Sequence, residues 1–450
     1  MTGDPGGPPT TEAARNRRKN QYLTPHADAF LPDVVQGTDD SFTPPPWLLK
    51  ALTAIALDPV ATLGKPPFRF EDSSEAAKHN ACLLATRGFD VGKFLGEHQD
   101  TTLGYGCEFR PPAQLELLLR RHPSFKLLQD LLENGMSYHY KVVLLEDERK
   151  EELAAILARG NHMSATAKGD QVLLLLSKDV THGFSAPIPV ETICLIPGAA
   201  VQSMGMATQL TMDNQGKPKE KFRLTQDLTF LSEPLPTPPR SINGRIVMEL
   251  YPEMTYGWCL PRTVHFIVSL RWHRPTRRIL IAKYDYSDAD RRVAHSGSAS
   301  PQTIAVHDGM AYLALRLTFG GSPNPPTWCM ISELVTDLTN EISQCEDWDP
   351  THLRSPVKPT APEPVYVAEA EAPLAPALPM AVEIPPIEQE KVDGFVDDLF
   401  YVFWDTPSNR ERLPHAVPPA MHVTSRPHAG DADEPLLRRN ILSRPSWDGQ

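Results

Sequence analysis

The sequence has 450 residues, 46 of them proline, and a formal net charge of −12 at pH 7. This length leaves room for two or three domains, and the proline content, about twice the usual frequency, argues against a chain that folds compactly throughout. Six scattered cysteines form no Cys-x-x-Cys pair or zinc-knuckle spacing, and no apolar segment resembles a signal peptide or a membrane span. We therefore expect reduced thiols in an intracellular protein, cytoplasmic or nuclear, without a membrane partner.

Three segments are too rich in proline and too poor in large apolar residues to pack a core. Residues 1–45 predict a disordered arm. Residues 349–391, rich in Pro, Ala and Glu, predict an extended linker or insertion. The chain from Pro414 onward is again rich in Pro, His and Arg, so we expect it to be only partly ordered.

Residues 46–185 predict a mainly helical region, because apolar side chains recur there at helical spacing. One helix should end before His122-Pro123, and further helices are predicted over about 125–132 and 146–159. Residues 171–176 are apolar and fit either a strand or a buried helical turn. Nothing in this region has the pattern of a catalytic site, so its role stays open.

The charge of the protein is unevenly distributed along the chain. Lys and Arg outnumber Asp and Glu between residues 211 and 320, whereas Asp and Glu are in large excess between 321 and 400. Six arginines cluster around one predicted strand of the basic stretch: Arg271, Arg274, Arg277, Arg278, Arg291 and Arg292. Contacts between arginine and phosphate give affinity for nucleic acid without sequence preference, so the cluster predicts a nucleic-acid backbone nearby. A solvated basic loop is the alternative interpretation.

The segments after residue 260 predict an α+β layer with an antiparallel sheet. A buried strand over 277–285 ends on Asp285 and should pair antiparallel with a strand over 394–403. Helices are predicted over about 262–272 and 327–343, because each carries an apolar stripe. We expect the helix over 327–343 to pack beneath the sheet and the helix over 262–272 to be its other support.

Two adjacent acids interrupt the apolar run near the C-terminus, in Gly394-Phe395-Val396-Asp397-Asp398-Leu399-Phe400. Read as a tight hairpin, this run places Asp397 and Asp398 at the turn, where both side chains can point the same way. Adjacent carboxylates repel each other and are costly to desolvate, so the pattern indicates a cation nearby. With Asp285 on a neighbouring strand, the acids supply the oxygen ligands of a two-ion Mg²⁺ site, in which the ions lie roughly 4 Å apart. An exposed acidic hairpin tip is the alternative.

These segments resemble, in order, the sequence blocks of reverse transcriptases of retroviruses and long-terminal-repeat retrotransposons, over less than half of the chain. Asp285 followed by Ala289 is similar to the first palm block, and Phe395-Val396-Asp397-Asp398 is similar to the third. The second block is similar to the stretch from Leu317 to Trp328, which contains Phe319-Gly320. The fingers hairpin and the turn that closes the fingers block are similar to Asp213-Asn214-Gln215-Gly216 with Lys219, Lys221, Arg223 and Asp227, and to Ser241-Ile242-Asn243.

The resemblance implies a right-hand polymerase, with the fingers and the first part of the palm in residues 186–348. Residues 392–450 would hold the Asp-Asp hairpin and an incomplete C-terminal part. The implied cofactors are two Mg²⁺ or Mn²⁺ ions, and the implied partners are deoxynucleoside triphosphates and an RNA or DNA template-primer. The implied catalytic acids are Asp285, Asp397 and Asp398, and the implied metal ligands are Asp285, Asp397 and the carbonyl of Tyr286. The implied substrate-binding residues are Lys221 and Arg223 at the triphosphate, Phe319 and Gly320 at the pocket floor, and Asp290 near the sugar.

Three features depart from the family pattern. Asp290 stands where the family has an aromatic residue that stacks on the sugar, and its charge would repel a triphosphate. The segment from Trp328 to Phe395 is longer than the family's spacing, and few residues follow Asp398 for the rest of the palm, a thumb and a ribonuclease H domain. We therefore expect a truncated reverse-transcriptase-like DNA polymerase that extends a primer poorly. The alternatives are a catalytically silent retroelement remnant that at most binds nucleic acid or proteins, and another metal-dependent phosphohydrolase built on the same acids.

Overall fold

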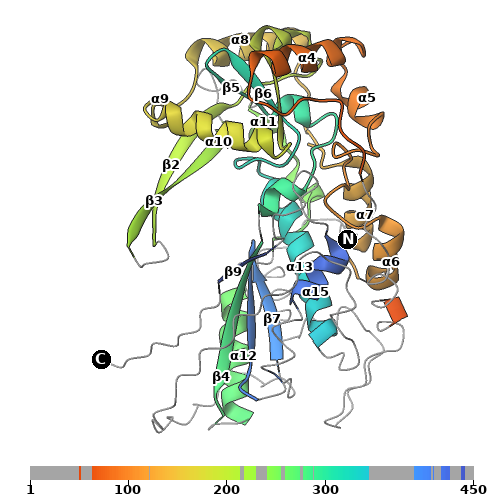
Figure 1. The fold of residues 1–450 in the computed structure, drawn as a ribbon, viewed down its shortest axis with the longest axis vertical. Coiled ribbons are helices and arrows are strands. Elements are labelled where there is room, and N and C mark those ends of the chain that lie inside the picture. The colour runs from red at the N-terminus through yellow and green to blue at the C-terminus, as the bar shows by residue number, and fades with distance from the viewer. Residues whose placement is uncertain are drawn as a thin grey trace, which may run out of the picture.

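The structure of the protein is a computed structural model that describes residues 50–51, 63–120, 122–212, 217–229, 241–254, 259–273, 277–286, 288–343, 390–406, 409, 417–425 and 437–440. The arm predicted over 1–45, nearly all of the predicted linker and the predicted turn at 213–216 lie outside these residues. The described part is a mixed α+β structure of helices and antiparallel sheets, as the sequence predicts (Figure 1).

Helices follow one another along the first part of the described chain. They are α4 (Ser74–Ala85), α5 (Val91–Gly96), α6 (Pro112–Leu119), α7 (Phe125–Asn134), α8 (Glu146–Arg159), α9 (Met163–Thr166) and α10 (Gly169–Thr181). Gly135 and Gly160 end α7 and α8 with φ of +71° and +75°, a conformation that glycine adopts without steric cost. Residues 171–176, which fit either a strand or a helical turn, lie inside α10.

A three-stranded antiparallel sheet lies among these helices (Figure 1). Its order is β1 (Ser185–Pro189), β6 (Met310–Ala314) and β5 (Ile304–His307). Phe68 and Leu84 from the helical part pack in one buried cluster with Ile188 of β1 and Leu313 of β6. The helical region therefore shares its core with β1, which follows it directly, and with β6, which lies more than a hundred residues further along the chain.

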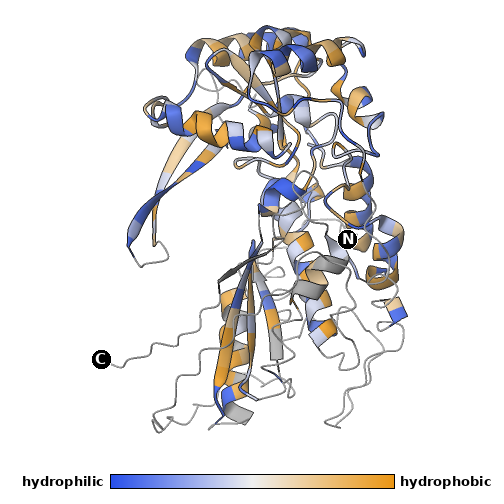
Figure 2. Ribbon diagram, viewed as in Figure 1, coloured by the Kyte–Doolittle hydropathy of each residue, from blue (hydrophilic) through white to orange (hydrophobic). Residues whose placement is uncertain are grey.

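A long two-stranded hairpin projects from this body (Figure 1). Strand β2 (Ser203–Met212) pairs antiparallel with β3 (Pro218–Asp227), and Gln209 lies opposite Lys221 in the register. Because side chains alternate between the faces of a strand, Lys221 and Arg223 share one face of β3. Met204 and Met206 of β2 belong to a buried cluster with Val172 and Leu176 of α10, against which Phe222 and Leu224 of β3 pack. Figure 2 shows the hydrophilic character of the outer part of β3.

The second main body contains a four-stranded antiparallel sheet. Its order is β7 (Glu390–Phe395), β8 (Asp398–Trp404), β4 (Ile279–Tyr286) and β9 (Leu437–Asn440). The predicted antiparallel pairing is confirmed, because β4 pairs with β8 from Ile279 opposite Trp404 to Asp285 opposite Asp398. The run 394–403, in which the sequence predicts a tight hairpin, contains the end of β7, a tight turn and most of β8.

Helices cover both faces of this sheet. On one face, Tyr284 of β4 and Tyr401 of β8 pack against Trp328 and Leu334 of α13 (Asn324–Ser343), a helix that begins three residues before its predicted start. Met421 of α15 (Val417–Thr424) belongs to the same cluster.

Helix α12 (Cys259–His273) packs on the opposite face from α13. Its Phe266 and Leu270 form a buried cluster with Val402 and Trp404 of β8, and these two residues alternate with Tyr401 and Phe403 along the strand. The helix predicted over 262–272 is therefore confirmed, and it supports the face of the sheet opposite to α13. Helical periodicity marks the apolar stripe of a helix and does not say which face of a sheet that stripe will cover.

Candidate functional site

Three carboxylates from two distant segments meet at one end of the four-stranded sheet. Asp285 is the penultimate residue of β4 and lies opposite Asp398, the first residue of β8. Asp397 immediately precedes β8. One carboxylate oxygen from each of the three acids lies within 4.8 Å of the other two, and all three residues are half-buried. The structure thus brings together the three acids that the sequence singled out.

The turn between β7 and β8 differs in detail from the predicted one. Phe395 pairs with Asp398, so the two turn residues are Val396 and Asp397, and Asp398 lies on the strand instead of in the turn. Val396 has a φ of +58°, and a positive φ at the first turn residue alone is the pattern of a type II′ hairpin turn. This conformation is unfavourable for a β-branched residue, so the surrounding contacts must hold it in place.

Two hydrogen bonds hold this turn against its neighbours. The indole Nε1 of Trp328, a fully buried residue of α13, donates to the carbonyl of Val396 at 2.8 Å. The backbone N–H of Tyr286 donates to the carbonyl of Asp397 at 2.9 Å. The ring of Tyr286 packs edge-to-face on Trp328, with 5.0 Å between ring centroids. These contacts fix Asp397 relative to Asp285.

Mutual repulsion and burial perturb the acids. Burial, followed by the charges of Asp397 and Asp398, raises the pKa of Asp285 to about 6, and Lys283 and Lys221 oppose this rise. Burial and the charge of Asp398 also raise the pKa of Asp397, and its own backbone hydrogen bond together with Arg223 and Lys283 opposes the shift. Ionisation of the half-buried cluster is therefore unfavourable in the free protein, and a bound cation would offset this cost.

Basic residues from two elements face the acids. Lys283, two residues before Asp285 on β4, forms an ion pair with Asp398, with 2.8 Å between Nζ and Oδ1. Lys221 and Arg223 of the β2–β3 hairpin are close enough to lower the pKa of Asp285 and of Asp397, respectively. The predicted basic hairpin thus lies within electrostatic reach of the acids. Lys283 had no predicted role, although the period of two along a strand places it on the same face as Asp285.

Phe319 and Gly320 join the hairpin to the rest of the site. The carbonyl of Phe319 accepts a hydrogen bond from the backbone N–H of Gln226 at 2.8 Å. Gly320 has a φ of +127°, and a Cβ atom there would lie 1.7 Å from the carbonyl oxygen of Gln226, so only glycine fits. The guanidinium of Arg223 lies 5.9 Å from the centroid of the Phe319 ring. Phe319 is 43 % exposed and therefore leaves part of its ring available to a ligand.

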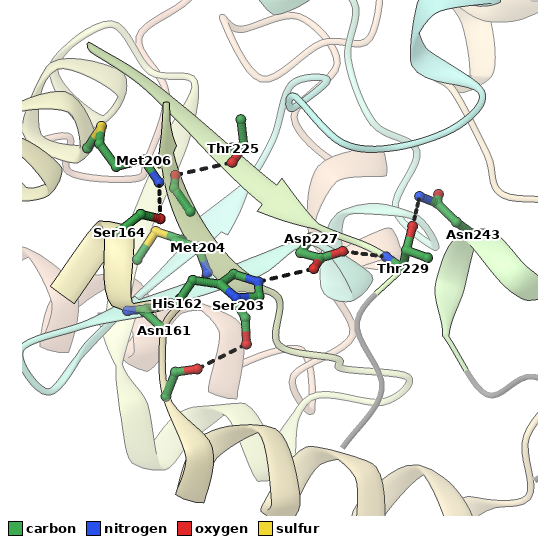
Figure 3. A network of polar contacts seen from close by, with 12 residues as sticks. Asn161, His162, Ser164, Ser203, Met204, Met206, Thr225, Asp227, Thr229 and Asn243 are labelled. Atoms are coloured by element: carbon green, nitrogen blue, oxygen red, sulfur yellow. Dashed lines mark hydrogen bonds and ion pairs between the residues drawn. The ribbon is translucent and has the colours of Figure 1, made fainter. Parts of the chain in front are cut away.

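A polar network fixes the base of the hairpin (Figure 3). His162, which precedes α9, bonds through Nε2 to a carboxylate oxygen of Asp227 at 3.1 Å, and Asp227 also accepts the backbone N–H of Thr229 at 3.0 Å. The side-chain amide of Asn243 donates to the Thr229 hydroxyl at 3.0 Å and to the carbonyl of Gly320 at 2.8 Å. The sequence could not reveal the contact between His162 and Asp227, because 65 residues separate them.

Asp290 lies in the short 3₁₀ helix η4 (Ala289–Arg292), close to the acid cluster. Burial raises its pKa to about 6, Asp397 adds to the rise, and Arg291 opposes it. A fourth carboxyl group therefore borders the site. It stands at the position where the family that the sequence resembles has an aromatic side chain.

Two of the six clustered arginines do not face a nucleic acid. Arg291 binds Asp179 at 2.7 Å, and Arg292, which is fully buried, binds Glu108 at 3.2 Å. Their predicted contact with a nucleic-acid backbone is wrong, because both side chains are used in ion pairs that join the helical part to η4. Arg277 is exposed and Arg278 lies 3.8 Å from Asp405, so these two remain near the surface of the sheet.

The acids suit a hard divalent cation. Mg²⁺ and Mn²⁺ prefer oxygen ligands, and three carboxylates offer up to six oxygens within a small volume. A Mg²⁺ ion binds oxygen at about 2.1 Å, so ligands on opposite sides of the ion lie about 4.2 Å apart. This spacing is compatible with the 4.8 Å limit within which the three oxygens lie.

No protein-family model and no curated protein matches the chain. One solved structure with partial likeness is that of the foamy viral protease-reverse transcriptase in complex with double-stranded DNA, at a TM-score of 0.30 and 10 % sequence identity. The alignment covers 66 % of this chain and 33 % of the viral chain. Likeness at this level does not establish a shared fold.

None of the helices in the described part of the chain combines the length and the hydropathy that spanning a lipid bilayer requires.

Proposed function

We propose that the chain carries a nucleotidyl-transfer site of the reverse-transcriptase type, in which a primer 3′-hydroxyl attacks a deoxynucleoside triphosphate. The convergence of Asp285, Asp397 and Asp398 at one end of an antiparallel sheet carries this proposal. More than a hundred residues separate the first acid from the pair, so their meeting depends on the whole fold of the sheet. The basic hairpin within electrostatic reach of the acids supplies the complementary charge that a triphosphate needs.

In the proposed site, Asp285, Asp397 and the carbonyl of Tyr286 hold the divalent ions. Bound there, Mg²⁺ or Mn²⁺ would lower the pKa of the attacking hydroxyl and neutralise charge on the leaving pyrophosphate. Asp398 supports the site electrostatically and keeps Lys283 beside it. Catalysis then depends mostly on positioning and on neutralisation of charge.

The substrate-binding roles follow from the same geometry. Arg223 and Lys221 would bind oxygens of the triphosphate. Both lie on one face of the hairpin, and their positive charges are close enough to the acids to oppose the rise in pKa of Asp397 and Asp285, respectively. Phe319 and Gly320 would line the nucleotide pocket beside Arg223. An RNA or DNA template-primer would contact the exposed cations near β4. Asp290 would weaken the binding of nucleotide whenever it is ionised, because a carboxylate repels a triphosphate in a half-buried site.

Single-nucleotide addition tests this function. Protein in excess over a radiolabelled primer-template, with Mn²⁺ and one deoxynucleoside triphosphate, should extend the primer by one residue. Asp397→Asn should lower the rate at least about a hundredfold, as expected for the loss of a group that stabilises charge in the transition state. The matched control is Asp308→Asn, an exposed acid outside the site whose carboxylate is 82 % exposed. Equal rates for the wild type and Asp397→Asn would refute the proposal.

A non-catalytic binding module is the second candidate, favoured by the carboxyl group of Asp290 at the edge of the site. This candidate predicts binding of a template-primer or of a partner protein without any nucleotide addition. Asp290→Tyr distinguishes the two, because removing the repulsive charge should restore part of the nucleotide binding if the site is catalytic. If it is a binding module, Asp290→Tyr should leave nucleotide addition undetectable.

A further inference from the structure

The side chain of Lys283 places a positive charge of the protein itself beside the acid cluster. It lies two residues before Asp285 on β4, so both side chains are on the same face of the sheet. Its Nζ lies 2.8 Å from Oδ1 of Asp398, and the two side chains are 25 % and 23 % exposed. A half-buried ion pair at this distance holds its partners more firmly than an exposed pair, because water screens it less.

The ion pair makes the three acids unequal. Lys283 is in direct contact with Asp398, whereas its positive charge acts on Asp285 and Asp397 by opposing the rise of their pKa. When ionised, the three carboxylates carry three negative charges, and counting only the direct ion pair with Lys283 leaves a total of two. A single divalent ion neutralises the remainder.

The size of the cluster agrees with this charge. The three carboxylate oxygens lie within 4.8 Å of one another, which is close to the width of the ligand shell of one ion. In two-ion sites the ions themselves lie roughly 3.5–4 Å apart and share ligands along that length. A second ion bound at Asp398 would also lie next to the ammonium group of Lys283, and two cations that close repel each other.

We propose that Lys283 takes the place of a second cation, so that the free protein binds one divalent ion between Asp285 and Asp397. Asp398 is held by Lys283 and is not a ligand in this state. This inference rests on the proposed metal site but not on nucleotide addition. A second ion would then enter only with a triphosphate, whose oxygens supply further ligands.

Counting Mn²⁺ ions tests the inference. Electron paramagnetic resonance of free Mn²⁺ gives the number bound by the whole chain, and the number that disappears in the Asp285→Asn/Asp397→Asn double variant belongs to the site. The wild type should bind one ion there. Lys283→Arg, which keeps the positive charge, should also bind one, whereas Lys283→Met should bind two. Lys283→Gln provides a second neutral variant should Lys283→Met fail to fold, and circular dichroism checks the fold of each.

Each outcome has a distinct meaning. Two ions at the site in the wild type, or a single ion with unchanged affinity in the neutral variants, would overturn the role of Lys283 and leave the proposed function intact. No site-dependent Mn²⁺ in the wild type or in the neutral variants would instead refute the metal site, and with it the proposed function.

Discussion

At the scale of single residues, the site is defined by acids that the free protein keeps under electrostatic strain. Asp285 is the clearest case, because burial and two neighbouring carboxylates raise its pKa to about 6 from an ordinary value near 3.8. Such a group is more stable protonated in the folded chain than in the unfolded chain. Protonation of Asp285 at low pH removes this unfavourable charge. In the proposed site, a bound cation would neutralise it instead.

The stability of the metal-free protein should therefore depend on pH in a defined direction. Between about pH 4 and pH 6 the folded chain binds more protons at Asp285 than the unfolded chain does. This site's contribution to the free energy of unfolding thus falls as the pH rises through that window. Asp285→Asn removes the charge and should raise the melting temperature by about 1–3 °C at pH 7.5 in the presence of a chelator, with little effect at pH 4.

The melting temperature can be followed by circular dichroism. Asp308→Asn, on an exposed loop, should leave the melting temperature unchanged at both pH values. A fall in melting temperature for Asp285→Asn at pH 7.5 would show that Asp285 makes favourable contacts in the free protein, contrary to the charge repulsion described above.

At the scale of elements, the turn between β7 and β8 depends on a helix that lies behind it. Val396 adopts a conformation unfavourable for its residue type, and the indole of Trp328 on α13 binds its carbonyl. On the opposite face of the sheet, the indole of Trp404 on β8 donates to the carbonyl of Leu270 on α12 at 3.3 Å. Two buried tryptophans thus make the same kind of bond, and one of them supports the acids.

This pair provides a matched experiment. Trp328→Phe and Trp404→Phe each lose one hydrogen bond to a backbone carbonyl, which should cost about 1 kcal/mol of unfolding free energy in each case. We expect Trp328→Phe alone to weaken Mn²⁺ binding several-fold, because of the two indole bonds only that of Trp328 supports the turn that presents Asp397. Denaturant titration and calorimetry with Mn²⁺ measure the two effects. Equal metal affinity in both variants would show that the turn keeps its shape without Trp328.

The β2–β3 hairpin is the second element that positions charge at the site. Its base is fixed by Gly320, Asn243 and the contact of His162 with Asp227, whereas Arg223 reaches toward the acids. Arg223→Met should weaken binding of a fluorescent deoxynucleoside triphosphate about tenfold in the presence of Mn²⁺, because one charged hydrogen bond is lost. Lys126→Met, an exposed position on α7, is the control that changes the net charge equally. Unchanged affinity for Arg223→Met would remove the hairpin from the substrate site.

At the scale of the whole molecule, the sequence predicted the mixed α+β class and the proximity of the three acids. The class follows from local apolar runs of strand and helix length, and the proximity of the acids follows from the expected antiparallel pairing of the strands that end on Asp285 and begin beside Asp397. The position of α12 could not be predicted, since its apolar stripe fits either face of the sheet. The ion pairs of Arg291 and Arg292 were also missed, because their partners Asp179 and Glu108 lie more than a hundred residues away. The roles of the substrate-binding residues stay predictions.

The proposed function depends most directly on a divalent ion lying between Asp285 and Asp397, and cleavage of the chain by bound Fe²⁺ locates such an ion. Fe²⁺ replaces Mg²⁺ at oxygen-rich sites, and with ascorbate and peroxide it generates radicals that cut the backbone nearby. We predict cuts near residues 285 and 397 together, suppressed by excess Mg²⁺ and lost in the Asp285→Asn/Asp397→Asn double variant. Cuts at other positions only, or cuts that persist in this variant, would contradict the assignment.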